Sequence, residues 1–243
     1  ALHSGHYGNW APNPAFNLAR LLASMKDAEG GVLIEGFYDD VAPLSDRERQ
    51  ALAELPANDT DLMRELFIAR PEGGGKKLVE LINQPSLNVR GLRSAYVGAE
   101  TQNIIPTQAI ASLDLRLVKN IQPARQFERV VAHIRKQGFC VTSKDPSPDE
   151  KLKCPLIAKV TTDRWGYPAS RTSMDLPVSR AVVRVVEEAT GGPVVKMPTL
   201  GGSAPMFIFE QWNLPVIGVP IVNHDNNQHA ADESLRLGNL WRG

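Results

Sequence analysis

The sequence has few cysteines, and this limits the kinds of site that it can build. Cys140 and Cys154 are the only two among 243 residues, too few for a disulfide-built scaffold or a four-cysteine zinc site. We predict that both are buried free thiols, which fits a reducing compartment and a cytoplasmic location. Because strands near residues 140 and 155 could be neighbours, a bridge between the two is the alternative.

An excess of one charge and long apolar runs are also lacking. Lys and Arg number 27, as do Asp and Glu, and the basic residues are scattered among carboxylates, which argues against a nucleic-acid partner. No apolar run approaches the ~20 residues of a membrane-spanning helix, and no basic-then-apolar segment opens the chain as a secretory signal would. With 42% hydrophobic and 22% charged residues, we expect an ordinary globular protein that binds neither nucleic acid nor membrane.

Helical and strand periodicities alternate in the first two thirds of the chain. Apolar residues at helical spacing predict helices from Pro14 to Met25 and over residues 123–137, the second ending at Gly138. Polar and apolar residues alternate within residues 107–118, which predicts a strand with one buried face. Further strands are expected at 87–96, 139–143 and 156–162, and residues 28–85 are expected to form an insertion of helices and loops.

This order predicts an α+β fold for residues 1–168, with a four-stranded antiparallel sheet and two helices on one face. The remainder has a different character. Residues 178–189 form a helical stripe ended by Gly191, residues 193–197 are a strand candidate, and Pro215–Val222 reads as a strand buried on both faces. These elements are too few to build a sheet, so we expect residues 169–243 to be an incomplete α/β part of a larger domain.

Both ends of the chain fit that expectation. Ala1 reads as the end of a strand, and the chain stops at Gly243 inside a predicted helix. We therefore predict that the chain is part of a longer protein.

Histidines are the first candidates for chemistry, and they lie at positions 3, 6, 133, 224 and 229. His133 falls inside a predicted helix, where we expect a surface or boundary residue without a functional role. His224 and His229 follow the predicted buried strand, at the end where α/β domains gather ligands. Zinc needs at least three protein ligands, and neither a His-x-Asp nor an HExxH pairing is present.

Three other motifs have plain structural interpretations. The EGGGKK segment at 72–77 lacks the residues of a phosphate-binding loop and is expected to be a flexible turn. Glu187 and Glu188 lie in a predicted helix and are expected to face solvent. The LGGSAP segment at 200–205 is common loop sequence, although its backbone amides could hold a carboxylate.

Five segments taken together resemble the di-zinc dipeptidases and aminoacyl hydrolases typified by carnosinase. They occur in the family's order and span nearly the whole chain: LHSGHYGNWAPNP, GFYDDVAPLSDRE, NIIPTQAIASLDLRLVKNIQP, LGGSAPMFIFE and NNQHAADESL. The resemblance implies that residues 1–168 are a lid that makes a homodimer. It also implies that residues 169–243 complete a catalytic domain holding two zinc ions.

The same resemblance implies roles for individual residues. His3 matches the lid histidine that reaches the partner subunit's active site and hydrogen-bonds the oxyanion, and Arg116 matches the arginine that binds the substrate carboxylate. Asn103 matches a polar residue near the substrate. The remaining matches are the substrate-terminus loop, formed by Gly201, Gly202 and Ser203, and the last zinc ligand, His229.

The resemblance also implies what this chain lacks. The family's other metal ligands, its bridging aspartate and its general-base glutamate all precede the position of Ala1. We therefore expect the 243-residue chain to be inactive alone and its parent to hydrolyse a small dipeptide or an N-acyl amino acid. Carnosinase-like, carboxypeptidase-like and acylase-like substrates remain open.

Two alternatives belong to other functional classes. The chain could act as a dimerisation or interaction module without catalysis. It could also be a serine hydrolase using Ser4 or Ser203, although neither lies in a GxSxG elbow and no triad order is evident.

Overall fold

The computed structural model describes residues 1–56, 58–162, 166–223 and 225–243. Its strands are β1 (Leu2–His3), β2 (Ser86–Arg93), β3 (Ile104–Ile105), β4 (Ile110–Arg116), β5 (Cys140–Thr142) and β6 (Ile157–Lys159). Its α-helices are α1 (Ser4–Tyr7), α2 (Pro14–Ala23), α3 (Asp46–Glu54), α4 (Asp59–Glu65), α5 (Leu78–Leu81), α6 (Pro123–Lys136), α7 (Pro148–Lys153), α8 (Pro177–Thr190), α9 (Phe207–Glu210) and α10 (Leu237–Arg242). A short 3₁₀ turn, Gly98–Glu100, precedes β3.

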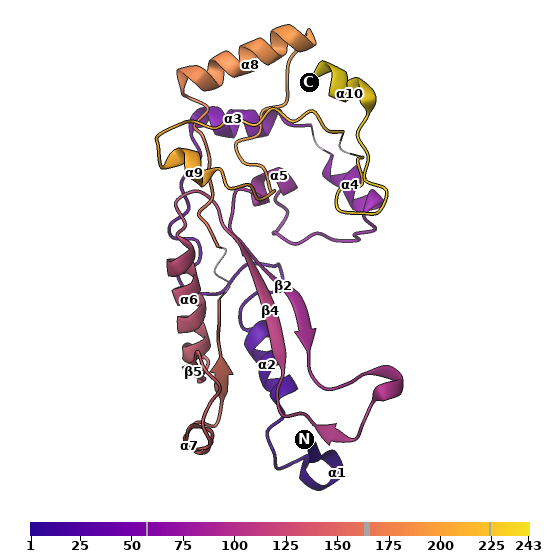
Figure 1. The fold of residues 1–243 in the computed structure, drawn as a ribbon, viewed down its shortest axis with the longest axis vertical. Coiled ribbons are helices and arrows are strands. Elements are labelled where there is room, and N and C mark those ends of the chain that lie inside the picture. The colour runs from indigo at the N-terminus through magenta and orange to yellow at the C-terminus, as the bar shows by residue number, and fades with distance from the viewer. Residues whose placement is uncertain (57, 163–165, 224) are drawn as a thin grey trace.

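The mixed α and β character predicted from the sequence is confirmed, but the four-stranded antiparallel sheet is not. Within the described ranges the strands pair two by two: β1 with β3, β2 with β4, and β5 with β6. The last pair is parallel, which its connection allows, because the chain between β5 and β6 makes a crossover through α7. The long β2–β4 hairpin runs through the middle of the molecule, with α2 and α6 beside it (Figure 1).

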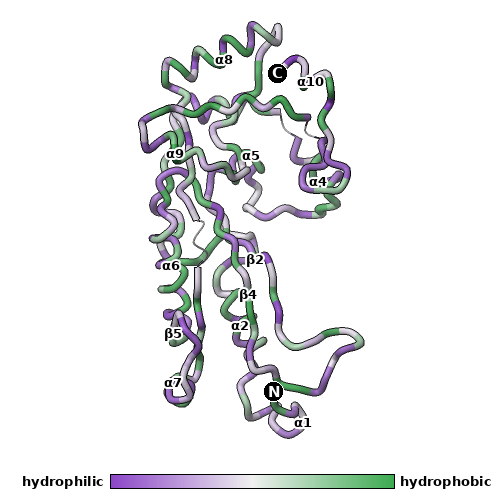
Figure 2. The backbone as a smooth tube through the Cα atoms, viewed as in Figure 1, coloured by the Kyte–Doolittle hydropathy of each residue, from purple (hydrophilic) through white to green (hydrophobic). Residues whose placement is uncertain are grey.

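The main core lies between α2, α6 and the strands. Its buried members are Leu21, Met25, Val32, Ile34, Phe37, Leu87, Val130 and Ile134. They come from the predicted helices, from the segment directly after α2 and, in the case of Leu87, from β2. The helical apolar stripes therefore identify the buried faces of α2 and α6 correctly. The tube of α6 alternates between hydrophobic and hydrophilic colours, as expected for a helix with one buried face (Figure 2).

Helix boundaries follow local capping chemistry. Ser45 and Glu48 form a reciprocal capping box at the start of α3, and Pro123 occupies the first turn of α6. Helix α8 ends at Gly191, whose φ of 73° is left-handed and therefore favours glycine. Gly73, Gly74 and Gly75 also have positive φ values, so the EGGGKK segment is a turn, as predicted.

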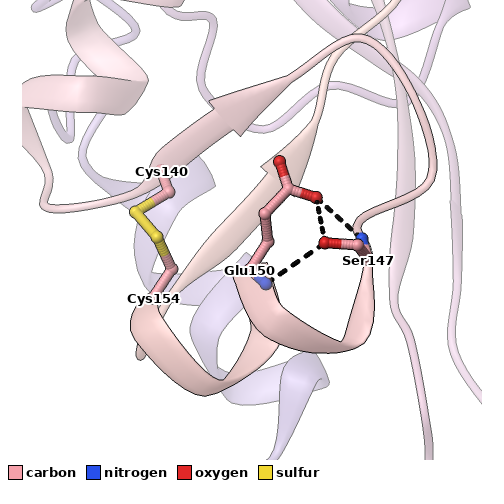
Figure 3. The surroundings of a disulfide bond; sticks show 4 residues. All are labelled: Cys140, Ser147, Glu150 and Cys154. Carbon is pink, nitrogen blue, oxygen red and sulfur yellow. Dashed lines mark hydrogen bonds between the residues drawn. A yellow bond between two sulfur atoms is a disulfide. The ribbon is translucent and has the colours of Figure 1, made fainter.

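The free-thiol prediction is wrong, because Cys140 and Cys154 form a disulfide (Figure 3). Cys140 begins β5 and Cys154 follows α7, whose first turn is fixed by Ser147 and Glu150 in a capping box. The parallel pairing of β5 with β6 brings the two cysteines together. The bond also removes the free thiols on which the inference of a reducing compartment rested.

Two strands predicted in residues 169–243 are absent. Residues 193–197 and Pro215–Val222 have no strand partner among the described residues. Val195 is 65% exposed and Val219 51% exposed, although a central strand would bury such residues on both faces. A strand needs a neighbour to pair its N–H and C=O groups, and the part of the chain that the structure describes supplies none here.

Helix α8 does confirm the helical stripe predicted there. Among the described residues, no helix is long and apolar enough to cross a membrane.

Candidate substrate and lid sites

Arg116 ends β4 on the polar face of the strand, where alternation placed it. Its Nε donates a hydrogen bond to Asp114 Oδ2 at 2.9 Å, and its terminal nitrogen donates to Ser203 Oγ at 2.7 Å. Arg116 and Ser203 are 87 positions apart in the sequence. The structure therefore brings together two residues that sequence reasoning assigned separately to the substrate site.

An open cavity of about 1490 Å³ surrounds this pair. Gly201 and Gly202 line it together with Arg116 and Ser203. Apolar side chains from several elements complete the wall: Leu115, Leu117, Met174, Val182, Val186 and Met197. Ligand pockets commonly enclose roughly 300–1,000 Å³, so this space exceeds what a small ligand alone would fill.

His3 and Asn103 form a second group. Antiparallel pairing places His3 opposite Ile104, directly after Asn103, and Ser4 N–H donates to the Asn103 carbonyl at 3.0 Å. Both residues are exposed. The His3 ring lies 4.6 Å from the His6 ring, centroid to centroid.

The two groups lie at opposite ends of the hairpin. Arg116 pairs with Ser86 at one end, and Arg93 pairs with Ile110 at the other. The N-terminus, with α1, lies near the Ile110 end (Figure 1). One copy of the chain therefore does not bring His3 next to Arg116.

His229 is not among the residues that line the cavity around Arg116. It is exposed, has a φ of 66°, and its N–H donates to Glu233 Oε2 at 3.3 Å. In the described parts of the chain no three His, Cys, Asp or Glu side chains are grouped to hold a metal ion. A single exposed imidazole does not fit the three or four ligands that zinc requires. His224, the other candidate after Pro215–Val222, lies outside the described residues.

His133 is buried more deeply than the surface or boundary position that the sequence suggested. It is only 7% exposed, and its Nε2 lies 2.9 Å from Ser24 Oγ at the end of α2. Burial, with a smaller contribution from the charge of Lys136, lowers its pKa. Because the Ser24 hydroxyl is also hydrogen-bonded to the Leu21 carbonyl, His133 joins α6 to α2 as a structural residue.

A polar junction that sequence reasoning missed joins the two parts of the chain. Glu210, in α9, accepts hydrogen bonds from Lys119 Nζ, Ser170 Oγ and Arg171 N–H. Burial opposes ionisation of this carboxylate, but these donors outweigh it and lower the pKa of Glu210.

Arg171 continues the junction into the insertion. Its guanidinium donates to the Ala42 and Pro43 carbonyls and lies 3.7 Å from the buried Glu48 carboxylate. Glu210 ends the quoted LGGSAPMFIFE segment, so its position was visible in the sequence, although its partners were not.

Ser203 is poorly placed to act as a nucleophile. Its hydroxyl oxygen accepts a hydrogen bond from the Arg116 guanidinium, which stays protonated and cannot accept a proton. Arg116 therefore holds this hydroxyl in place and cannot act as its general base.

Comparisons with known proteins identify the family. The family model described as the peptidase dimerisation domain, M20_dimer, matches residues 1–139. The Cys-Gly metallodipeptidase of Candida albicans is 27% identical over 100% of this chain and 48% of its own length. The human Beta-Ala-His dipeptidase is 24% identical over 99% of this chain and 46% of its own.

Structural comparison agrees. A crystal structure of an M20 family metallo-carboxypeptidase from Sulfolobus solfataricus superposes with a TM-score of 0.81 and 26% identity, covering 99% of this chain and 52% of that one. The chain thus spans about half the length of the relatives that it matches. Because the family model covers more than half of the 243 residues, the chain belongs to the M20 peptidase dimerisation-domain family.

Proposed function

We propose that this chain supplies the lid and the substrate-carboxylate site of a metallo-exopeptidase that hydrolyses a dipeptide or an N-acyl amino acid. The observation that carries the proposal is the Arg116–Ser203 hydrogen bond at the edge of a large cavity. In the proposed division, residues 1–168 are the lid and dimerisation domain, and residues 169–243 are part of the catalytic domain.

Arg116 has the chemistry to bind a substrate carboxylate. A guanidinium offers a planar fork of donors that matches a carboxylate, and Asp114 orients this fork through the Nε donor. The terminal nitrogen that now donates to Ser203 would turn to the ligand. The Ser203 hydroxyl and the Gly201 and Gly202 amides then add neutral donors around the same carboxylate.

His3 acts, in this proposal, on the substrate bound by a second copy of the chain. Its imidazole is exposed and anchored by the β1–β3 pairing, with Asn103 beside it. A donor aimed at the developing oxyanion is among the larger contributions to catalysis. Because His3 and Arg116 lie at opposite ends of the hairpin, a homodimer joined through the lid lets both act on one substrate.

Metal ions complete the proposed enzyme. Two zinc ions would supply a bound nucleophilic water and Lewis-acid polarisation. Within this chain His229 is the proposed ligand, and the described residues do not complete a zinc site. We accordingly propose that the 243-residue chain alone is inactive.

Amide hydrolysis with and without a chelator tests the function. The intact protein should release amino acids from a panel of dipeptides and N-acyl amino acids, lose activity on chelation, and regain it with zinc. The 243-residue chain should show no turnover under the same conditions. Zinc-dependent turnover by the short chain, or chelator-resistant turnover by the intact protein, would contradict the proposal.

A second candidate is a dimerisation module without a catalytic role for the lid, favoured by the match that covers residues 1–139. Mixing wild-type intact protein with a His3→Ala variant separates the two. A histidine acting across the dimer predicts partial activity in mixed dimers, whereas a purely structural lid predicts no loss. The proposed cytoplasmic location is tested by fractionation together with the redox state of Cys140 and Cys154 in cells.

A further inference from the structure

The backbone around His3 fixes one tautomer of its imidazole. His3 caps the short helix α1, and the Gly5 N–H donates a hydrogen bond to His3 Nδ1 at 3.1 Å. An imidazole nitrogen that accepts a hydrogen bond carries no proton, so the neutral ring must carry its proton on Nε2. The Nε2–H is then the donor left for another partner.

The small size of Gly5 also leaves room for the His3 ring in this position. A Cβ added at Gly5 would lie 2.9 Å from His3 Cε1 and 3.2 Å from His3 Nδ1. The first distance is shorter than real Cβ contacts allow, so any larger residue would displace the ring. The His6 ring lies 4.6 Å from the His3 ring, centroid to centroid, and limits its movement on that side.

The main chain on both sides of the ring is also held. His3 pairs with Ile104 in the β1–β3 ladder, and the next N–H, that of Ser4, donates to Asn103 O. The imidazole therefore projects from a fixed backbone while its Nδ1 edge is turned back toward Gly5.

From this geometry we propose that Gly5 is a positioning residue: its N–H holds His3 in the Nε2–H tautomer and its missing side chain leaves room for the ring. The inference rests on the proposed role of His3 as an oxyanion donor. With the opposite tautomer, Nε2 would present a lone pair to a negative oxygen, which repels it. Gly5 thus acts through His3 and does not touch the substrate.

Long-range ¹H–¹⁵N correlation spectra of the 243-residue chain, labelled with ¹⁵N-histidine at about pH 8 where an ordinary imidazole is neutral, test the tautomer directly. The signals lost in His3→Ala identify the ring. We expect a protonated Nε2 and an unprotonated Nδ1 in the wild type. Gly5→Ala should give a mixture of the two tautomers or the opposite tautomer. Gly192→Ala, where a Cβ meets nothing within 4 Å, should leave the His3 signals unchanged.

A wild-type His3 ring protonated at Nδ1, or a Gly5→Ala spectrum identical to the wild type, would overturn the proposal. If Gly5→Ala does not fold, the wild-type spectrum still shows which nitrogen of His3 carries the proton and so tests the proposal. In the intact protein, Gly5→Ala should lower kcat by about 10- to 100-fold with KM changed by less than about twofold. If His3→Ala keeps full activity while the spectra are as expected, the proposed function fails and the tautomer assignment stands.

Discussion

The two parts of the chain differ in how they bury their apolar residues. Buried hydrophobic side chains run from Leu21 to Ile134, with Pro198 the one buried apolar residue beyond them in the described parts of the chain. After residue 168 the large apolar side chains include Val195, Trp212 and Trp241, which are 65%, 74% and 80% exposed. The first part also exposes large apolar side chains, among them Trp10 and Phe67, but it has a buried core beside them. The second part has no comparable core among the described residues, so its apolar faces need other partners.

Core truncation should give the largest contrast between the two parts. Phe37 is 1% exposed, so Phe37→Ala should lower the free energy of unfolding by about 3–5 kcal/mol, through lost burial and a cavity. Phe209, 47% exposed in α9, is the matched control. Phe209→Ala should change the free energy of unfolding by less than about 0.5 kcal/mol. Denaturant unfolding measures both, and equal losses would contradict the comparison.

Breaking the polar junction between the two parts should have the next largest effect on stability. Arg171→Ala leaves the buried Glu48 carboxylate and the Ala42 and Pro43 carbonyls without this donor, at a cost of about 3 kcal/mol. Arg184→Ala on the exposed face of α8 is the control, because its ion pair with Glu188 is solvent-exposed and worth less than about 1 kcal/mol. Hydrogen exchange should show faster exchange in residues 169–218 for Arg171→Ala alone.

The disulfide should stabilise only the first part. Cys140 and Cys154 close a loop of sequence separation 14, for which chain entropy gives about 3 kcal/mol as an upper value. The Cys140→Ser, Cys154→Ser double variant should therefore lose about 2–3 kcal/mol. Its hydrogen exchange should accelerate in β5, α7 and β6 and stay unchanged in α8, and acceleration in α8 would contradict the separation of the two parts.

A smaller, pH-dependent effect should also belong to the first part. Burial lowers the pKa of His133, so the unfolded chain takes up the proton first as the pH falls. Stability should be constant above about pH 6.5 and decrease from there down to the lowered native pKa. His133→Gln should flatten this slope in thermal unfolding measured between pH 5 and 8, and an unchanged slope would show that other groups cause it.

The same difference explains how much the sequence could predict. The helices containing Leu21 and Val130 and the strands of the β2–β4 hairpin were predictable because their pattern and their partners lie within the chain. The strand expected at Pro215–Val222 was not found, because a ladder requires a neighbour as well as a suitable sequence. The parallel β5–β6 pair and its disulfide depend on a pairing direction that residue types do not specify.

The residues of the candidate site also differ in how far the sequence alone could predict them. Strand alternation was enough to place Arg116 on the polar face, but the Glu210 junction required knowing which loops meet. The burial of His133 was underestimated because its partner, Ser24, lies 109 positions away. Residue type and spacing thus locate single side chains, whereas long-range contacts decide what they do.

The proposed carboxylate site, with Arg116 from one part and Ser203 from the other, is tested most directly by the kinetics of Arg116→Lys in the intact protein. Lysine keeps the charge but loses the planar fork of donors. We predict that KM for a dipeptide rises by about 10- to 100-fold, the loss of one charged hydrogen bond of about 1.5–3 kcal/mol, while Arg93→Lys at the far end of the hairpin leaves it unchanged. An unchanged KM in Arg116→Lys would contradict the account.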